Sequence, residues 1–174
     1  MKITVLRLGH RPQRDKRLTT HLVLCARALG AEGVIYSGRR DPALEEGIRD
    51  TVKRWGGTFS ISYESNWRSL VNSWSDNIIH LTMYGIPIQE ISDTIRNSGE
   101  ELLVVVGGPK VPRDMYEYAT WNVSVTNQPH SEVSALAIFM YLLQGEAALK
   151  HEFPGGLIKI TPNKRGKSVE VSKD

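Results

Sequence analysis

The chain of 174 residues is long enough for one domain whose core needs neither disulfides nor a structural metal. Its contents of 40% hydrophobic and 24% charged residues are ordinary for a soluble globular protein. Cys25 is the only cysteine, which excludes an internal disulfide and a four-cysteine zinc site and favours a reducing compartment. No stretch approaches the apolar length of a membrane span, and the N-terminus starts with a strand-like pattern instead of a signal peptide, so we expect a cytoplasmic protein with no membrane segment.

The net charge of +3 says little, but its distribution is uneven. Residues 7–21 carry five basic side chains against one acidic, and residues 157–174 carry five against two. Two basic ends on a near-neutral body suit a partner that bears phosphates. The alternative is that these basic residues only keep a strand end and a tail solvated.

Strand-like and helix-like patterns alternate along the chain, which predicts an α/β fold with a mostly parallel sheet. Residues 102–106 (LLVVV) form a continuous apolar run, as expected for a strand that is covered on both faces. The last segment departs from the alternation and predicts a basic β-hairpin, so we expect a domain over 1–150 with an extension over 151–174. The predicted strands are 2–8, 33–36, 58–62, 77–82, 102–106 and 121–125, with the hairpin at 157–161 and 169–172. The predicted helices are 18–29, 42–55, 66–74, 88–98, 115–118 and 131–144.

Three of the predicted strands end in unusual loops, at 82–87, 107–112 and 126–132. Ligands of open parallel sheets bind in the loops beyond the carboxyl ends of the strands. Each of the three loops combines glycine or proline with polar groups, so that backbone groups can approach a polar small molecule closely and on a rigid turn. Singly each loop is more often a plain turn, but three in succession predict a site.

Several common motifs are absent from the sequence. There is no GxxxxGK[ST] phosphate loop, and no GxGxxG follows the first strand, which argues against an NTPase and an ordinary dinucleotide dehydrogenase. There is also no HExxH motif or His/Cys cluster, so we expect no metal. We interpret His80 and Cys25, both in apolar surroundings, as core residues.

A second group of candidate residues lies in the basic segment that follows the first strand. If a helix begins near Arg14, then Arg14, Arg17 and His21 lie on one face at i, i+3 and i+7. Guanidinium groups bind phosphates through two hydrogen bonds and can stabilise an oxyanion. We expect Asp15 to cap the turn or to orient one of the arginines. The alternative is a solvated helix start.

Four segments resemble a known family: RLGHRPQRDKRLTTHLVLCARALGAEGVIYSG, NIIHLTMYG, VVVGGPKVP and VTNQPHSEVSALAIF. Over about residues 3–146 the chain is similar to the archaeal tRNA cytidine 2′-O-methyltransferases of the TΨC loop, which belong to the SPOUT class, and its basic hairpin resembles that family's C-terminal extension. The resemblance implies a Rossmann-like sheet whose C-terminal part forms a deep trefoil knot, although knots are exceptions to the rules of chain connection. It also implies a homodimer that acts on tRNA with S-adenosylmethionine as its cofactor.

The resemblance further assigns cofactor contacts by motif, all of them in or beside the three loops. These are Leu81, Gly107, Gly108, Pro109, Lys110, Val111, Val125, Thr126, Asn127, Gln128, Pro129, His130, Ser131 and Glu132.

The chain departs from the wider ribose-methylating group at one position. That group has an arginine six residues before the glycine that ends its first helix, and here that position is Leu24. We therefore expect a displaced catalytic arginine, Arg17 in first place and Arg14 in reserve, that supports the developing alkoxide or helps to remove its proton, either alone or with a phosphate or His21. We expect Lys110, Arg11 and Arg14 to contact phosphates and the basic tail to hold the tRNA.

Two other interpretations stay open from the sequence. One is a SPOUT methyltransferase with another RNA target, such as a ribosomal RNA ribose or a guanine base. The other is a noncatalytic RNA-binding module that has kept the α/β scaffold, which predicts salt-sensitive RNA binding without cofactor binding.

Overall fold

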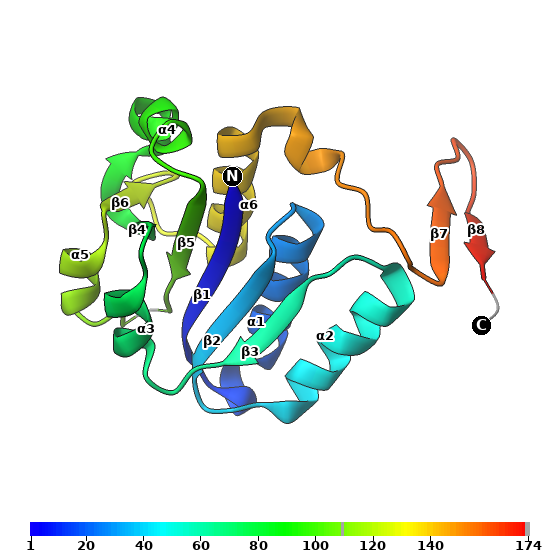
Figure 1. Ribbon diagram of the computed structural model, residues 1–174, viewed down its shortest axis with the longest axis horizontal. Coiled ribbons are helices and arrows are strands. Elements are labelled where there is room, and N and C mark those ends of the chain that lie inside the picture. The colour runs from blue at the N-terminus through cyan, green and yellow to red at the C-terminus, as the bar shows by residue number, and fades with distance from the viewer. Residues whose placement is uncertain (109, 173–174) are drawn as a thin grey trace.

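The computed structural model describes residues 1–108 and 110–172. Strands and helices alternate as the sequence predicts (Figure 1). The strands are β1 Lys2–His10, β2 Gly33–Gly38, β3 Ser60–Tyr63, β4 Asn77–Pro87, β5 Glu101–Val106, β6 Trp121–Ser124, β7 Ile158–Thr161 and β8 Ser168–Val171. The helices are α1 Pro12–Ala28, α2 Pro42–Trp55, α3 Trp67–Ser73, α4 Ile88–Arg96, α5 Asp114–Tyr118, α6 Glu132–Gln144 and the 3₁₀ turn Gly145–Leu149.

Six strands form one sheet in the order β3-β2-β1-β5-β4-β6, and every pairing in it is parallel. The central strand β5 is covered on both faces, which confirms the prediction from its apolar run. Leu102 and Val104 point into the core that the sheet shares with α1, α2, α4 and α6, while Leu103 and Val105 point into the smaller core under α3 and α5. The α/β class with a parallel sheet is therefore confirmed.

The C-terminal hairpin is a separate antiparallel pair of strands, β7 and β8, set apart from the main sheet (Figure 1). The segment before it is anchored on the body: the Gly57 amide donates to the Pro154 carbonyl at 2.8 Å, and the Arg27 guanidinium lies 4.4 Å from the centre of the Phe153 ring. The predicted hairpin is thus confirmed. Lys173, part of the predicted basic tail, lies outside the described residues.

The first helix begins earlier than the sequence predicts, at Pro12 instead of at Arg14 or Leu18. Proline fits the first helical position because its ring fixes φ and its missing N–H needs no partner there. The regular apolar spacing starts only at Leu18, because most side chains of residues 12–17 are polar and lie on the exposed face of the first helical turns. Asp15 makes two hydrogen bonds with Arg11, at 2.8 and 3.0 Å, so it orients an arginine, and these bonds hold the pKa of its carboxyl below the usual value.

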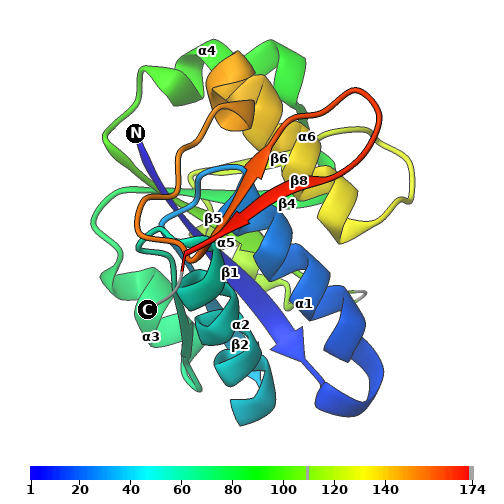
Figure 2. The ribbon, with the colours of Figure 1, turned by 90° about the vertical axis from the view of Figure 1, so that its right-hand side faces the viewer.

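One stretch, Glu132–Leu149, is long and apolar enough to cross a membrane by length and composition alone, so the expectation that no stretch has this apolar length was wrong. In this fold 28% of the stretch is buried, mainly along the face of α6 that packs on the sheet. Its side chains Leu136, Phe139, Met140 and Leu143 are buried against the sheet, and Figure 2 shows α6 lying beside α1.

Candidate functional site

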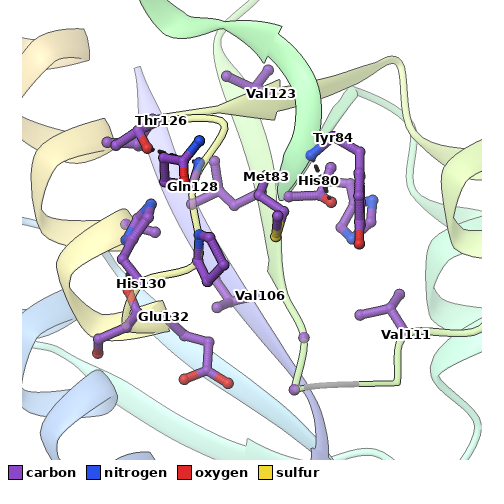
Figure 3. A pocket seen from close by; sticks show the side chains of 18 of the residues that line it. His80, Met83, Tyr84, Val106, Val111, Val123, Thr126, Gln128, His130 and Glu132 are labelled. Carbon is purple, nitrogen blue, oxygen red and sulfur yellow. Dashed lines mark hydrogen bonds between the residues drawn. The ribbon is translucent and has the colours of Figure 1, made fainter.

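A cavity of about 530 Å³ opens at the carboxyl ends of β4, β5 and β6 (Figure 3). Pockets of about 300 to 1,000 Å³ are typical of small-molecule sites. All three segments that the sequence singled out contribute to its walls. The predicted convergence of the three loops is therefore present in the fold.

The first segment is a bulge inside β4 and not a loop after it, which corrects the sequence analysis. Leu81 and Ile86 both pair with Val123 of β6, so the four residues 82–85 are excluded from the ladder. Gly85 lies against the backbone of Asn122, where a Cβ atom would overlap main-chain atoms. The bulge pushes Met83 and Tyr84 over the cavity and leaves Tyr84 76% exposed.

The second segment begins directly after β5 with Gly107 and Gly108. A Cβ atom on Gly107 would overlap the Cγ2 atom of Val111, so glycine allows the loop to fold back on itself. Lys110 and Val111 then line the cavity.

The third segment is tied to the first by one side chain. The Asn127 amide nitrogen donates to the carbonyl of Met83 at 2.7 Å and approaches that of Gly85 at 3.4 Å. Ser131 caps the N-terminus of α6 by accepting from the Val133 amide at 3.2 Å. The wall of the cavity is thus held by hydrogen bonds between segments more than forty residues apart.

Most of the predicted cofactor residues line this one cavity. Asn127 does not line it and acts as the tie described above, and Pro109 lies outside the described residues. The predicted residues that line the cavity are Leu81, Gly107, Gly108, Lys110, Val111, Val125, Thr126, Gln128, Pro129, His130, Ser131 and Glu132. Lining residues that the sequence analysis did not assign to a site are His80, Val106, Tyr116, Val123 and Ala135.

His80 is a buried residue that also belongs to this wall. Its Nδ1 lies 2.8 Å from the Asn122 side-chain oxygen, and the Asn122 amide nitrogen donates to the Tyr116 carbonyl at 2.9 Å. The Tyr116 ring meets the imidazole edge to face, with 4.7 Å between ring centres. Burial lowers the pKa of His80, so the ring is neutral at physiological pH.

Arg7 was missed as a site residue, although it continues the buried face of β1 that contains Ile3 and Val5. Its side chain is 1% exposed, and its Nη2 lies 4.0 Å from the Glu132 carboxylate at the cavity edge. A Cβ atom on Gly108 would stand 3.6 and 3.7 Å from the two terminal nitrogens of Arg7. Burial lowers the pKa of Arg7, whereas Glu132 and Asp15 raise it; an arginine remains charged in either case.

The arginines predicted to be catalytic do not line the cavity of this chain. Arg14 and Arg17 are exposed on α1, together with His21, as the shared helix face predicts. Arg14 lines a smaller hollow with Arg11 and Arg39. A single chain therefore brings together the predicted cofactor residues but not the arginines.

A buried histidine contacts both α1 and the start of α2. His10 Nδ1 lies 2.8 Å from the Thr19 hydroxyl of α1, and its Nε2 lies 3.2 Å from the Asp41 carboxylate at the start of α2. These contacts connect α1 and the start of α2 to the carboxyl end of β1.

No group of three or more His, Cys, Asp or Glu side chains that could hold a metal occurs within 1–108 and 110–172. Cys25 is half-buried between α1 and α6, with its Sγ 3.9 Å from the Val133 carbonyl, and burial raises the pKa of its thiol. Cys25 is thus only partly buried and lies outside the core clusters, which corrects its interpretation as a core residue.

Solved structures define the class of this fold. The A. aeolicus TrmH/SpoU tRNA modifying enzyme superimposes with a TM-score of 0.61 at 15% identity, over 85% of this chain and 78% of that one. The SpoU methyltransferase AviRb from Streptomyces viridochromogenes, solved with AdoMet, gives a TM-score of 0.54 at 12% identity, over 81% and 56%. These matches show the SPOUT fold. The trefoil knot itself stays a prediction.

Sequence comparison identifies the family. Residues 55–170 match the model of the tRNA ribose 2′-O-methyltransferase family aTrm56. The tRNA (cytidine(56)-2′-O)-methyltransferase of Methanothermobacter thermautotrophicus is 49% identical over 100% of this chain and 99% of its own length. That of Methanothrix thermoacetophila is 52% identical over 97% of each chain. The chain belongs to the aTrm56 family of tRNA ribose 2′-O-methyltransferases.

Proposed function

We propose that this protein transfers a methyl group from S-adenosylmethionine to the ribose 2′-hydroxyl of cytidine 56 in tRNA. One observation carries the proposal: the three segments that the family resemblance assigns to the cofactor line one cavity, in a chain about half identical to relatives named for this reaction. Neither a base methyltransferase nor a noncatalytic RNA-binding module accounts for both findings.

The residues of the cavity fit S-adenosylmethionine. Apolar side chains at Leu81, Val106 and Val125 suit the faces of an adenine ring, and the glycine-rich turn after β5 offers backbone groups to its polar edge. Glu132 and Lys110 supply one carboxylate and one ammonium for the charged methionine part.

The bound cofactor supplies a methyl group on a positively charged sulfur, which needs no further activation. The protein must align the 2′-oxygen and stabilise the negative charge that develops on it as the proton leaves. We assign that role to Arg17, with Arg14 in reserve, because guanidinium groups on the exposed face of α1 can bind an oxyanion. Since both arginines lie outside the cavity of their own chain, we propose that the two subunits of a homodimer complete each site.

Exposed apolar side chains support the dimer. Leu24 of α1 and Ile138 and Tyr141 of α6 are 36%, 43% and 42% exposed, and the two helices pack together on one side of the sheet. We also propose a division into a catalytic domain over 1–150 and a tRNA-binding hairpin over 151–174. A cytoplasmic location accords with a tRNA substrate.

The reaction is tested by incubating the protein with an unmodified tRNA transcript and S-adenosylmethionine and identifying the product nucleoside by mass spectrometry. We expect 2′-O-methylcytidine, and none from a transcript with 2′-deoxycytidine at position 56. A methylated base, or equal methylation of the deoxy transcript, would overturn the proposal.

A further inference from the structure

Tyr84 is the most exposed large apolar side chain in the part of the chain that the structure describes. It stands on the bulge of β4 at the rim of the cavity, on the opposite side from Glu132 (Figure 3). The family resemblance assigns no cofactor contact to it. Single exposed apolar residues are common on protein surfaces, so exposure alone decides nothing. The place of this ring beside the methyl-donor cavity, and the way its backbone is held, indicate a function.

The backbone is fixed on both sides of Tyr84. The Met83 carbonyl accepts from the Asn127 amide nitrogen at 2.7 Å, and Gly85 lies directly against the backbone of Asn122. Among the described residues the Tyr84 ring stacks on no other aromatic ring. The bulge therefore holds one flat apolar face toward solvent at a defined place. An aromatic group on a fixed backbone loses little conformational entropy when it binds a partner.

The proposed reaction brings a nucleobase to this place. A ribose 2′-oxygen reaches a methyl group inside a protein cavity only if its nucleotide turns away from the neighbouring bases. The base of that nucleotide then loses the neighbours on which it was stacked. It is attached to the sugar carbon next to the one that carries the 2′-oxygen, so it stays at the mouth of the cavity. Unstacked bases bind readily to the flat faces of aromatic side chains.

We propose that Tyr84 stacks on the base of the nucleotide that is methylated and thereby holds its ribose over the cavity. The inference rests on the proposed function and adds to it an RNA contact on the chain that binds the methyl donor, in addition to the arginines of α1. Every base has a flat face, so this contact retains the nucleotide without selecting its base. It predicts a role for Tyr84 in tRNA binding and none in cofactor binding.

A fluorescent base tests the contact directly. The full-length protein is saturated with S-adenosylhomocysteine and with a tRNA transcript that carries pyrrolocytosine at position 56, whose emission is quenched by stacking. We expect the complex of Tyr84→Ala to be brighter than that of the wild type. Tyr84→Phe, which keeps the ring, should match the wild type, and Tyr84→Leu, which keeps only the apolar bulk, should match Tyr84→Ala. Equal emission from the wild-type and Tyr84→Ala complexes would overturn the proposal.

Steady-state kinetics and calorimetry separate the RNA from other partners of the ring. Tyr84→Ala should raise KM for tRNA about 5- to 100-fold, the range expected for loss of one stacked base, and Tyr84→Phe should stay within about twofold. The affinity of both variants for S-adenosylhomocysteine should equal that of the wild type. A matching loss of that affinity would show that the ring covers the cofactor, and a change of oligomeric state in sedimentation would show that it lies between subunits. Either result would overturn the proposal.

Ile86 offers a matched control on the same strand. It is 45% exposed and does not line the cavity. Ile86→Ala should leave the emission and KM for tRNA as in the wild type, and losses equal to those of Tyr84→Ala would show a general response to altering the bulge and overturn the proposal. If the wild type methylates the tRNA and Tyr84→Ala does so with the same KM, only the role of Tyr84 fails. If the wild type transfers no methyl group, the proposed function itself fails.

Discussion

The side chain of Asn122 fixes the tautomer of His80. Because the Asn122 amide nitrogen donates to the Tyr116 carbonyl, its oxygen must face His80 and accept from Nδ1–H, across 2.8 Å. The other ring nitrogen, Nε2, is then an acceptor, and it has no partner among the described residues. The wall of the cavity on the β4 side thus contains a neutral histidine with a defined proton position.

This neutral state makes stability depend on pH. Burial lowers the pKa of folded His80 below the unfolded value of about 6.5, so the unfolded chain takes up a proton first as the pH falls. The contribution of neutral His80 to the free energy of unfolding is therefore fully present above about pH 6.5. It is lost as the pH falls toward the folded pKa. We expect the free energy of unfolding, measured by urea denaturation, to fall between pH 7 and pH 5.5 in the wild type and to fall less in His80→Gln. An equal fall in both proteins would contradict the claim that folded His80 is buried in its neutral form.

The exposed arginines of α1 should affect methyl transfer and not cofactor binding. If Arg17 stabilises the developing alkoxide, Arg17→Ala should lower kcat by about 10² to 10³ and leave the affinity for S-adenosylhomocysteine unchanged. Arg14→Ala should act mainly on tRNA affinity. The assignment of Arg17 fails if Arg17→Ala stays within a few-fold of the wild type while Arg14→Ala is inactive.

Gly107 should be required for the shape of the cavity. Gly107→Ala places a methyl group on Val111, so the turn after β5 must shift, and we expect a large loss of calorimetric affinity for S-adenosylhomocysteine. Gly47 is the control because it lies exposed in α2 with open space at its Cβ position. Gly47→Ala should keep the affinity and stabilise the fold by about 0.5 to 1 kcal/mol, since alanine is the better helix former. Equal affinities for both variants would mean that the Gly107 turn does not shape the site.

The basic turn of the hairpin should supply part of the tRNA affinity. Replacing Lys164, Arg165 and Lys167 by glutamine should weaken tRNA binding and reduce its salt dependence, by about 0.7 to 0.9 in the logarithmic slope for each phosphate that the protein no longer neutralises. As a control, replacing Lys2, Lys53 and Lys150 by glutamine removes the same charge and should change neither tRNA affinity nor its salt dependence. Filter-binding titrations over a series of salt concentrations measure the slope for each protein. Identical slopes for the wild type and the hairpin variant would exclude the hairpin from the RNA interface.

The sequence predicted the features that depend on local residue patterns and missed those that depend on contacts between distant segments. The apolar run of β5 and the proline at the start of α2 correctly indicated a buried strand and a helix start. The bulge of β4 was missed because it depends on how Leu81 and Ile86 pair with β6, which is distant in sequence. Arg7 was missed because its charge suggested a surface position, although it follows Ile3 and Val5 on a face that becomes buried once β1 lies inside the sheet.

The central claim is that the segments around Met83, Gly108 and Gln128 hold the methyl donor. A crystal structure of the protein soaked or co-crystallised with S-adenosylhomocysteine tests it most directly. We expect one ligand per chain with its adenosine among these three segments. Clear density for the ligand at another place on the protein, with this cavity empty, would contradict the account.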